Sequence, residues 1–332
     1  MDPITQGALG AVASQSFARN KPEMKLGLIA GTLGGMAADL DVLIRSSDDP
    51  ILFLEFHRQF THSLVFIPFG GAIVAAALYP FFKKTVNFKK LWFFTTIGYA
   101  THALLDACTS YGTQLWWPFT NARVAWDNVA IIDPVPTLTI LLASFFAYKF
   151  NAKRYAQIGL ALFIAYLLAG VVQRERVETV VAAIAEERGH TPTRVTVKPT
   201  FANLILWRTI YEFENKYYVD AVKVPALGEN LRFPGASIEK VDAETAFPEI
   251  PSDSQTRIDI KRFGWFSDSY LGRVPDIENA IGDVRYAFVP NEIQPLWGIE
   301  FDPSLPNQHV KYVTYRDDPR AKLDKFLEML TK

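Results

Sequence analysis

The chain has 332 residues, a nearly balanced charge (formally −1) and 49% apolar residues, averages that would suit a soluble protein of two domains. The balanced charge, without a basic patch interleaved with aromatic residues, gives no support for a nucleic-acid partner. The single cysteine, Cys108, excludes an internal disulfide and a cysteine-rich zinc site. The averages conceal two unlike parts, because charges are sparse between residues 26 and 172 and frequent from residue 173 onward.

Long apolar runs dominate the first part of the chain. A helix needs roughly 20 mainly apolar residues to cross the hydrocarbon core of a bilayer. Five segments approach this length and are predicted to span a membrane: 26–40, 63–82, 91–108, 135–150 and 155–172. Segment 3–17 is weaker and is expected to form a half-buried or re-entrant helix. The first residues lack the features of a cleavable signal peptide, so the spans themselves are expected to direct insertion. Residues 1–173 are therefore predicted to form a mainly α membrane domain.

Basic residues indicate how these spans are oriented. When the spans alternate in direction, three short loops fall on one side, and lysine and arginine in short loops mark the cytoplasmic side. The three loops contain Arg19, Lys21 and Lys25; Lys83, Lys84, Lys89 and Lys90; and Lys149, Lys153 and Arg154. Segments 41–60 and 109–134 and everything after residue 172 are then predicted to lie outside the cytoplasm. Arg174 and Arg176 run against this pattern.

The second part, residues 174–332, is predicted to be a small α+β domain on the extracytoplasmic side. It begins as a helix through residue 187, which Gly189 and Pro192 end. Runs of β-branched and aromatic residues predict extended segments at 194–197, 204–213, 217–224, 285–289 and 310–315. Proline and glycine punctuate residues 225–251, and residues 322–330 have the pattern of a short amphipathic helix.

Ionisable residues gather at the ends of the first three predicted spans. Such residues are costly in a membrane and are candidates for function. The set consists of Asp39 and Asp41 after the first span, His57 and His62 before the second, and His102 and Asp106 late in the third. Under the predicted topology all six side chains approach the outer face. We therefore expect them to form one site there.

The pair His102 and Asp106 has the spacing i, i+4, so both side chains project from one helix face. This arrangement suits two ligands of one metal ion or a bridge between two ions. The alternative is a buried hydrogen bond that joins helices.

The histidines His57 and His62 are five residues apart and do not share a helix face. Both can contribute if His57 lies in the preceding loop and His62 in the first turn, with Thr61 or Ser63 as the helix N-cap. The alternative is an interfacial loop with incidental histidines. Arg58 between them would bind either a phosphate or a lipid headgroup.

The carboxylates of Asp39 and Asp41 follow a predicted helix C-terminus, where the helix dipole disfavours negative charge. A bound cation would explain their position, and the alternative is a pair of solvated loop acids. Asp41 would bind the metal, orient a histidine or act as a general base.

Three histidines and three aspartates, without cysteine, suit zinc, manganese or iron. A catalytic zinc needs about three protein ligands and an open position for water. Six candidates exceed this number, so the site would hold one or two ions, zinc above all, and activate water as the nucleophile. The sequence contains no G-x-S-x-G motif and no glycine-rich phosphate loop.

Several motifs are familiar in combination: DPITQGALG, GGMAADLDVL, HRQFTHS, HALLDACTSYGTQLWWPF, NLILWR and RFGWFS. They resemble the YdjM/YbcI-type family of membrane-bound metal-dependent hydrolases, through nearly the whole chain. HALLD is also similar to the HxxxD element of zinc-dependent phospholipases C and related single-strand nucleases, which cut phosphoesters. The resemblance implies an inner-membrane protein that hydrolyses its substrate with a bound metal. It carries over to Asp39, Asp41, His57, His62, His102 and Asp106. Many members read Thr-His where this chain has Thr5-Gln6, so no N-terminal ligand is expected.

The sequence thus predicts a metal-dependent, phosphodiesterase-like hydrolase of the inner (cytoplasmic) membrane. Its substrate would be a lipid-like or lipid-linked phosphoester at the outer face, and its partners would be membrane lipids. The metal ligands would be Asp39, His57, His62, His102 and Asp106, with Asp41 and Arg58 in catalytic roles. The alternative is a non-enzymatic membrane protein, acting in ion or proton transport or in envelope stress, that uses the same cluster to bind ions.

Overall fold

The computed structural model describes residues 1–316 and 318–332, and they form two compact units. The N-terminal unit contains residues 1–43, 56–172 and 201–203. The C-terminal unit contains residues 44–55, 173–200 and 204–332. The short segment 44–55 therefore belongs to the C-terminal unit, although it lies between two stretches of the N-terminal one. Helix α7 contributes its first half to one unit and its second half to the other.

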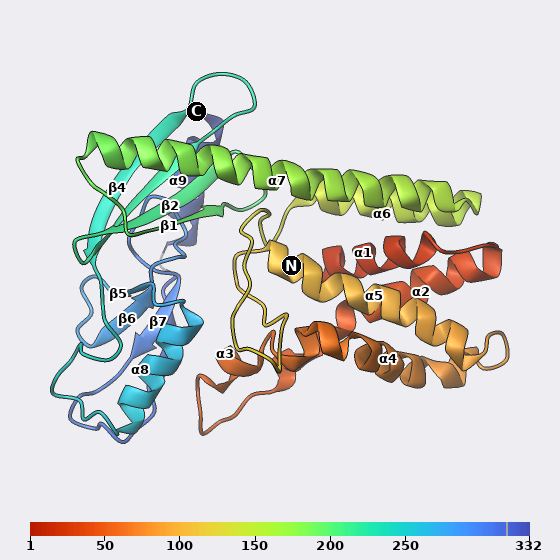
Figure 1. Ribbon diagram of the computed structural model, residues 1–332, viewed down its shortest axis with the longest axis horizontal. Helices are drawn as coiled ribbons and strands as arrows, with labels where there is room; N and C mark the ends of the chain where they lie inside the picture. Colours follow the sequence, from red (N-terminus) through yellow and green to blue (C-terminus); the bar gives the residue numbers. More distant parts are fainter. Residues whose placement is uncertain (317) are drawn as a thin grey trace. The chain divides into compact units, whose positions relative to one another are not determined.

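The N-terminal unit consists of helices joined by loops, the longest of them between α5 and α6 (Figure 1). Its α-helices are α1 (Pro3–Gln15), α2 (Lys21–Ala37), α4 (Ile67–Phe82), α5 (Phe88–Cys108), α6 (Pro134–Phe150) and the first half of α7 (Lys153–Glu187). Three short 3-10 helices, η1 (Ala38–Leu43), η2 (Phe60–His62) and η3 (Leu64–Phe66), connect α2 with α4, together with the short α3 (Leu52–Phe56).

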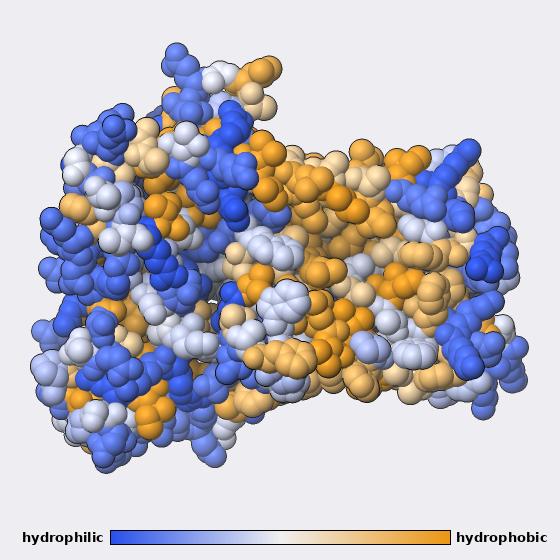
Figure 2. Space-filling view, in the orientation of Figure 1, coloured by the Kyte–Doolittle hydropathy of each residue, from blue (hydrophilic) through white to orange (hydrophobic). Residues whose placement is uncertain are grey.

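Among the described residues, three helices are long and apolar enough to cross a membrane: Lys21–Leu43, Leu64–Phe82 and Lys153–Glu187. These coincide with three of the five predicted spans. The other two predicted spans form α5 and the shorter apolar helix α6, which has 17 residues. Helix α1 has 13 residues, most of them buried, and at 1.5 Å per residue it is too short to cross a bilayer alone. Figure 2 shows apolar residues over the outer surface of these helices.

Glycines let α1, α2 and α5 approach one another closely. A Cβ atom on Gly31 of α2 would overlap the carbonyl oxygen of Gly10 in α1, and one on Gly98 of α5 would overlap that of Gly31. Gly34 and Gly35 meet backbone oxygens of α5 and α1 in the same way. Close backbone approach at small residues is how membrane helices associate without a hydrophobic driving force between them. This packing fixes the end of α2 against α5, which positions the site below.

The C-terminal unit contains two four-stranded antiparallel sheets, with orders β1-β2-β3-β4 and β5-β6-β7-β8. The strands are β1 (Arg194–Pro199), β2 (Leu206–Phe213), β3 (Lys216–Lys223), β4 (Leu231–Glu239), β5 (Leu271–Arg273), β6 (Ala280–Asp283), β7 (Trp297–Glu300) and β8 (Lys311–Thr314). Its further helices are α8 (Gln255–Phe266) and α9 (Pro319–Thr331). The α+β character predicted from the sequence is confirmed.

Helices cover both faces of the first sheet. The second half of α7 packs Val181 and Ile184 against Trp207 and Tyr211 of β2. On the opposite face, Leu206 of β2 lies in one cluster with Phe326 and Met329 of α9. Every position from Leu206 to Tyr211 is consequently buried. The two-sided cover explains why side chains of both faces of this strand are buried, Arg208 and Thr209 included.

Several features of the C-terminal unit differ from the sequence-based prediction, which also did not include β5, β6 and β7. The segment 285–289 is not a strand, because Asp283 accepts hydrogen bonds from the backbone and guanidinium of Arg285 and so ends β6 in a turn. The stretch 225–251, for which no strand was predicted because proline and glycine punctuate it, contains β4, with Pro234 and Gly235 in its middle. Because β4 is the outer strand of its sheet, it tolerates a proline and a bulge. Helix α8 was not predicted at all.

Replacing Gly31 with alanine tests the glycine packing. Because the added methyl overlaps backbone, the helices must separate, and overpacking of this kind costs roughly 1–3 kcal/mol. We expect Gly31→Ala to lower the thermal midpoint of the detergent-purified protein. Ala76→Leu on the exposed face of α4 is the control and should leave the midpoint unchanged. Equal midpoints for both variants would contradict the packing argument.

Candidate metal centre

Three elements of the N-terminal unit bring the predicted side chains together at one end of the helices. The 3-10 helix η1 carries Asp39 and Asp41, directly after α2 ends. The segment before and within η2 carries His57 and His62. The last turns of α5 carry His102 and Asp106. The turns α1–α2, α4–α5 and α6–α7, which contain the basic residues, lie at the opposite end of these helices (Figure 1).

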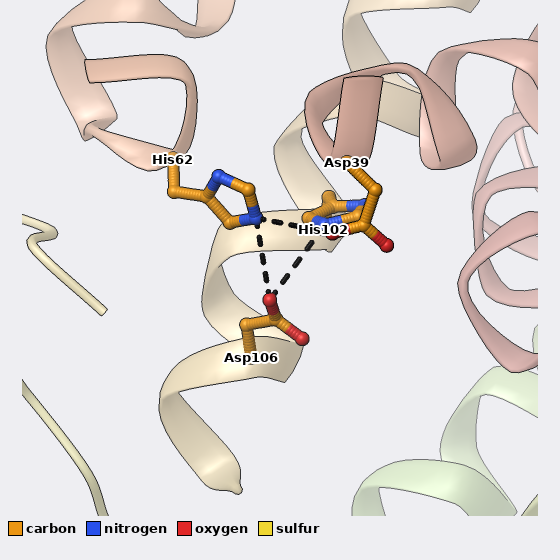
Figure 3. A group of neighbouring side chains, drawn as sticks. All are labelled: Asp39, His62, His102 and Asp106. Atoms are coloured by element: carbon orange, nitrogen blue, oxygen red, sulfur yellow. Dashed lines mark hydrogen bonds and ion pairs between the residues drawn. The ribbon is translucent and has the colours of Figure 1, made fainter. Parts of the chain in front are cut away.

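Four of these side chains converge on one point (Figure 3). The ligand atoms of Asp39, His62, His102 and Asp106 all lie within 4.8 Å of one another. His62 Nε2 lies 3.3 Å from Asp106 Oδ2 and 3.6 Å from Asp39 Oδ1. His102 Nε2 lies 3.3 Å from Asp39 Oδ1 and 3.7 Å from Asp106 Oδ2. We refer to these four residues as the central cluster. His62, His102 and Asp106 are fully buried.

The hydrogen bonds of the two imidazoles fix which nitrogen faces the cluster. His102 Nδ1 lies 2.5 Å from the carbonyl oxygen of Gly35, which can only accept, so Nδ1 carries a proton. His62 Nδ1 lies 3.0 Å from Thr61 Oγ1 and 3.2 Å from Asp41 Oδ2. Because the threonine hydroxyl itself donates to Asp41, the same argument places a proton on His62 Nδ1. In neutral imidazoles, the Nε2 lone pairs then face carboxylate oxygens.

Lone pairs that face one another in a buried space are unfavourable without a cation between them. Within the described part of the chain, neither His62 Nε2 nor Asp106 Oδ2 has a hydrogen-bond partner. Two imidazole nitrogens and two carboxylates form a donor set that suits a divalent cation such as zinc. The donor chemistry of the central cluster therefore fits the metal that the family resemblance implies.

The electrostatics of the cluster point in the same direction. Burial by itself lowers the pKa of the His62 imidazole, but the neighbouring carboxylates of Asp106, Asp39 and Asp41 raise it to about 10. Surroundings that stabilise an extra proton this strongly also stabilise a metal cation. Metal binding would have to displace that proton, because a histidine ligand must present a lone pair.

Asp41 holds two histidines in position. Its Oδ1 lies 2.8 Å from His57 Nδ1, and its Oδ2 accepts from the backbone of Arg58 at 3.0 Å and from Thr61 Oγ1 at 2.6 Å. A carboxylate that binds Nδ1 of a ligating histidine fixes the tautomer and the orientation of the ring. With both oxygens engaged in this way, the placement of Asp41 favours the orienting role among the three that the sequence left open.

His57 lies beside the central cluster rather than in it. Asp39, Asp41 and His57 form a second group whose ligand atoms lie within 4.8 Å of one another, sharing Asp39 with the first. A second ion there would have to replace the hydrogen bond between His57 and Asp41. The side chain of His57 is 22% exposed, whereas those of His62 and His102 are buried completely.

Arg58 and Gln6 surround Asp106. Arg58 Nε lies 3.0 Å from Asp106 Oδ2, and its Nη1 donates to Thr109 at 3.2 Å. Gln6 Nε2 donates to Asp106 Oδ1 at 2.8 Å, and the Met1 amino group contacts the same oxygen. Since Arg58 is only 5% exposed and paired with a carboxylate, its placement favours holding Asp106 over binding a phosphate directly.

Several supporting residues carried no recognisable signal in the sequence. Thr61 was considered as a helix cap, but its hydroxyl binds Asp41, while Ser63 caps the short η3 and α4 begins only at Ile67. The sequence predicts no ligand at Gln6, and its hydrogen bond to Asp106 joins residues that are 100 positions apart. The role of the Gly35 carbonyl cannot be predicted from the sequence, because every residue has a backbone carbonyl.

Comparison with known proteins shows the family of this chain. The family model described as "YdjM inner membrane protein" matches residues 1–177, more than half of the chain and all of the metal centre. The chain belongs to the YdjM inner membrane protein family. The match ends at residue 177, so it does not include the motifs NLILWR and RFGWFS.

Two curated relatives each resemble part of the chain. The uncharacterized protein YfhP of Bacillus subtilis (strain 168) is 27% identical over 174 residues, 52% of this chain and 53% of that protein. The inner membrane protein YbcI of Escherichia coli (strain K12) is 34% identical over 111 residues, 31% of this chain and 61% of that protein. The chain thus spans little more than half the length of these relatives. No solved structure matches it significantly.

Substitutions of His102 and Asp106 separate a metal site from a structural hydrogen bond. Substituting a residue that only orients a ligand typically lowers metal affinity about 10–100-fold. If His102 and Asp106 are ligands, His102→Ala and Asp106→Ala should each lower it at least as much. Elemental analysis and thermal unfolding of detergent-purified protein measure both effects. Asp133→Asn removes a buried carboxylate bonded to Tyr166 and is the control. It should lower the thermal midpoint and leave the amount of bound metal unchanged. Variants that lose stability and keep full metal content would show a structural role.

Asp41→Asn tests the orienting role. The amide can replace one hydrogen bond but cannot accept from both histidines and Thr61, so His62 loses its fixed tautomer. We expect metal affinity to fall about 10–100-fold with the bound stoichiometry retained at saturating metal. A competition titration with a chromophoric chelator measures this. Complete loss of binding at saturation would instead make Asp41 a direct ligand.

Proposed function

We propose that this protein is a membrane-bound metal-dependent hydrolase that cleaves a phosphoester of a lipid or lipid-linked molecule at the outer face of the inner membrane. The observation that carries the proposal is the central cluster: two buried imidazole nitrogens and two carboxylates are directed at one point, and His62 Nε2 and Asp106 Oδ2 have no hydrogen-bond partner among the described residues. Zinc suits this donor set best. When bound, the metal would supply Lewis-acid activation of water at neutral pH.

The chain's own residues prepare this chemistry. Asp41 fixes the rings of His57 and His62, and Arg58 offsets part of the negative charge of Asp106. His57 Nδ1 is bound to Asp41, which leaves Nε2 of this partly exposed imidazole as the atom that can accept a proton. A histidine oriented by a carboxylate next to a metal site is suited to general acid–base catalysis.

A groove between α1, α2 and α6 supports a lipid as the substrate. It has a volume of about 430 Å³ and is lined mainly by apolar side chains, among them Ile4, Leu28, Met36, Leu141 and Phe145. The groove includes Gly7, next to Gln6, and Met36, three residues before Asp39. A hydrocarbon chain in it would leave the headgroup beside the central cluster. The volume is within the usual range of ligand pockets, roughly 300–1,000 Å³.

The position of the cluster favours a surface site over a transport path. Charges that carry an ion or proton across a membrane are expected at several depths, whereas these six residues lie at one end of the helices. The basic turns lie at the other end, and lysine and arginine favour the cytoplasmic side. We therefore assign the cluster, and with it the C-terminal unit, to the outer face.

Activity assays with and without metal test the proposal. Purified protein in detergent, incubated with phospholipids and with bis(p-nitrophenyl) phosphate, should release product with zinc, lose activity with a chelator and recover it on adding zinc. His102→Ala should be inactive at all zinc concentrations, and Asp133→Asn should remain active. Stoichiometric metal binding without hydrolysis of any substrate in the screen would favour the non-enzymatic alternative.

A further inference from the structure

The segment that joins Asp41 to His57 is anchored in the C-terminal unit. Residues 44–55 separate these two members of the metal centre in the sequence, yet they belong to the compact unit formed by residues 173–200 and 204–332. The chain therefore leaves the helical unit between the two residues, packs on the other unit and returns. Contacts that hold residues 44–55 in place also restrict the chain on either side of them, which leads to Asp41 and to His57.

Arg262 of α8 holds the segment through two of its carboxylates, those of Asp49 and Glu55. Its Nη1 and Nη2 donate to the two oxygens of Asp49 at 3.1 and 2.8 Å, and its Nε donates to Glu55 at 2.6 Å. Its Nη1 also donates to Asp259 at 2.8 Å. Bidentate pairing of this kind fixes geometry as well as charge. Glu55 is two residues from His57, so the contact is close to the site in sequence.

The guanidinium of Arg262 is itself held in place. Asp259 is fully buried and also binds His309 Nδ1 at 2.8 Å and the backbone of Val310 at 3.2 Å. Next to this network, Phe53 of the segment packs edge-on against Tyr312 of β8, with ring centroids 5.1 Å apart. The segment is thus attached to α8 and to the second sheet at positions more than 200 residues away in the chain.

We propose that Arg262 is a positioning residue for the metal centre. By anchoring residues 44–55 it limits the conformations open to the link between Asp41 and His57, so less entropy is lost when these residues adopt the geometry that the metal requires. The C-terminal unit would in this way set the metal affinity of the helical unit. The inference rests on the proposed function insofar as it requires the centre to bind metal.

Zinc affinity of the full-length protein in detergent tests this role. Arg262→Ala should weaken zinc binding about 10-fold or more in a chelator competition. Arg262→Lys, which keeps the charge but not the bidentate fork, should give an intermediate affinity. Arg262→Glu should be worse than Arg262→Ala, and adding Asp49→Arg to it should restore part of the affinity.

Two controls on the same helix exclude trivial explanations. Lys261→Ala removes a pair with Glu244, outside the segment, and should not change zinc affinity. Arg257→Met removes a buried guanidinium that binds four backbone carbonyls, so it should lower the thermal midpoint and leave zinc affinity unchanged. This inference alone is overturned if wild-type protein binds zinc but Arg262→Ala leaves the zinc affinity unchanged. It is also overturned if Arg257→Met lowers the zinc affinity as much as Arg262→Ala does. Wild-type protein that binds no zinc overturns the proposed function and this inference together.

Discussion

The structure depends on one electrostatic requirement: buried acceptor atoms that face one another need a cation between them. His62 and His102 each use Nδ1 in a hydrogen bond that directs Nε2 at carboxylates. A proton on His62, together with Arg58 beside Asp106, offsets this negative charge, and a divalent cation would replace that proton. The glycine contacts between α1, α2 and α5 serve this requirement, because they bring η1 and the Gly35 carbonyl up to the last turns of α5.

The two compact units differ in the chemistry of their polar residues. The helical unit carries every member of the metal centre and the apolar groove, and it is the part that matches the YdjM family. The C-terminal unit is built around buried arginines that bind carbonyl oxygens or carboxylates, such as Arg208 and Arg285. Burial lowers the pKa of Arg208 to about 9, which fits a structural group satisfied by carbonyls.

The sequence predicted what depends on composition and missed what depends on tertiary contact. The apolar runs at 63–82 and 155–172 identify helices because a bilayer demands length and hydrophobicity. The ionisable residues are recognisable for the same reason, since charged and histidine side chains inside membrane spans are rare. Spacing could not distinguish a ligand from an orienting residue, because Asp39 and Asp41 are the same residue type only two positions apart. β4 was concealed by Pro234, which an outer strand tolerates, and Arg262 lies 207 residues from Glu55.

X-ray absorption spectroscopy of zinc-loaded protein tests the central claim most directly, because it reports the atoms around the ion without requiring a substrate. The account predicts one shell of nitrogen and oxygen neighbours, with the outer-shell scattering of two imidazole rings and no sulfur. In His62→Ala or His102→Ala protein, any zinc that remains should show one imidazole ring fewer. A fully hydrated ion, a cysteine ligand, or a spectrum that neither substitution alters would contradict it.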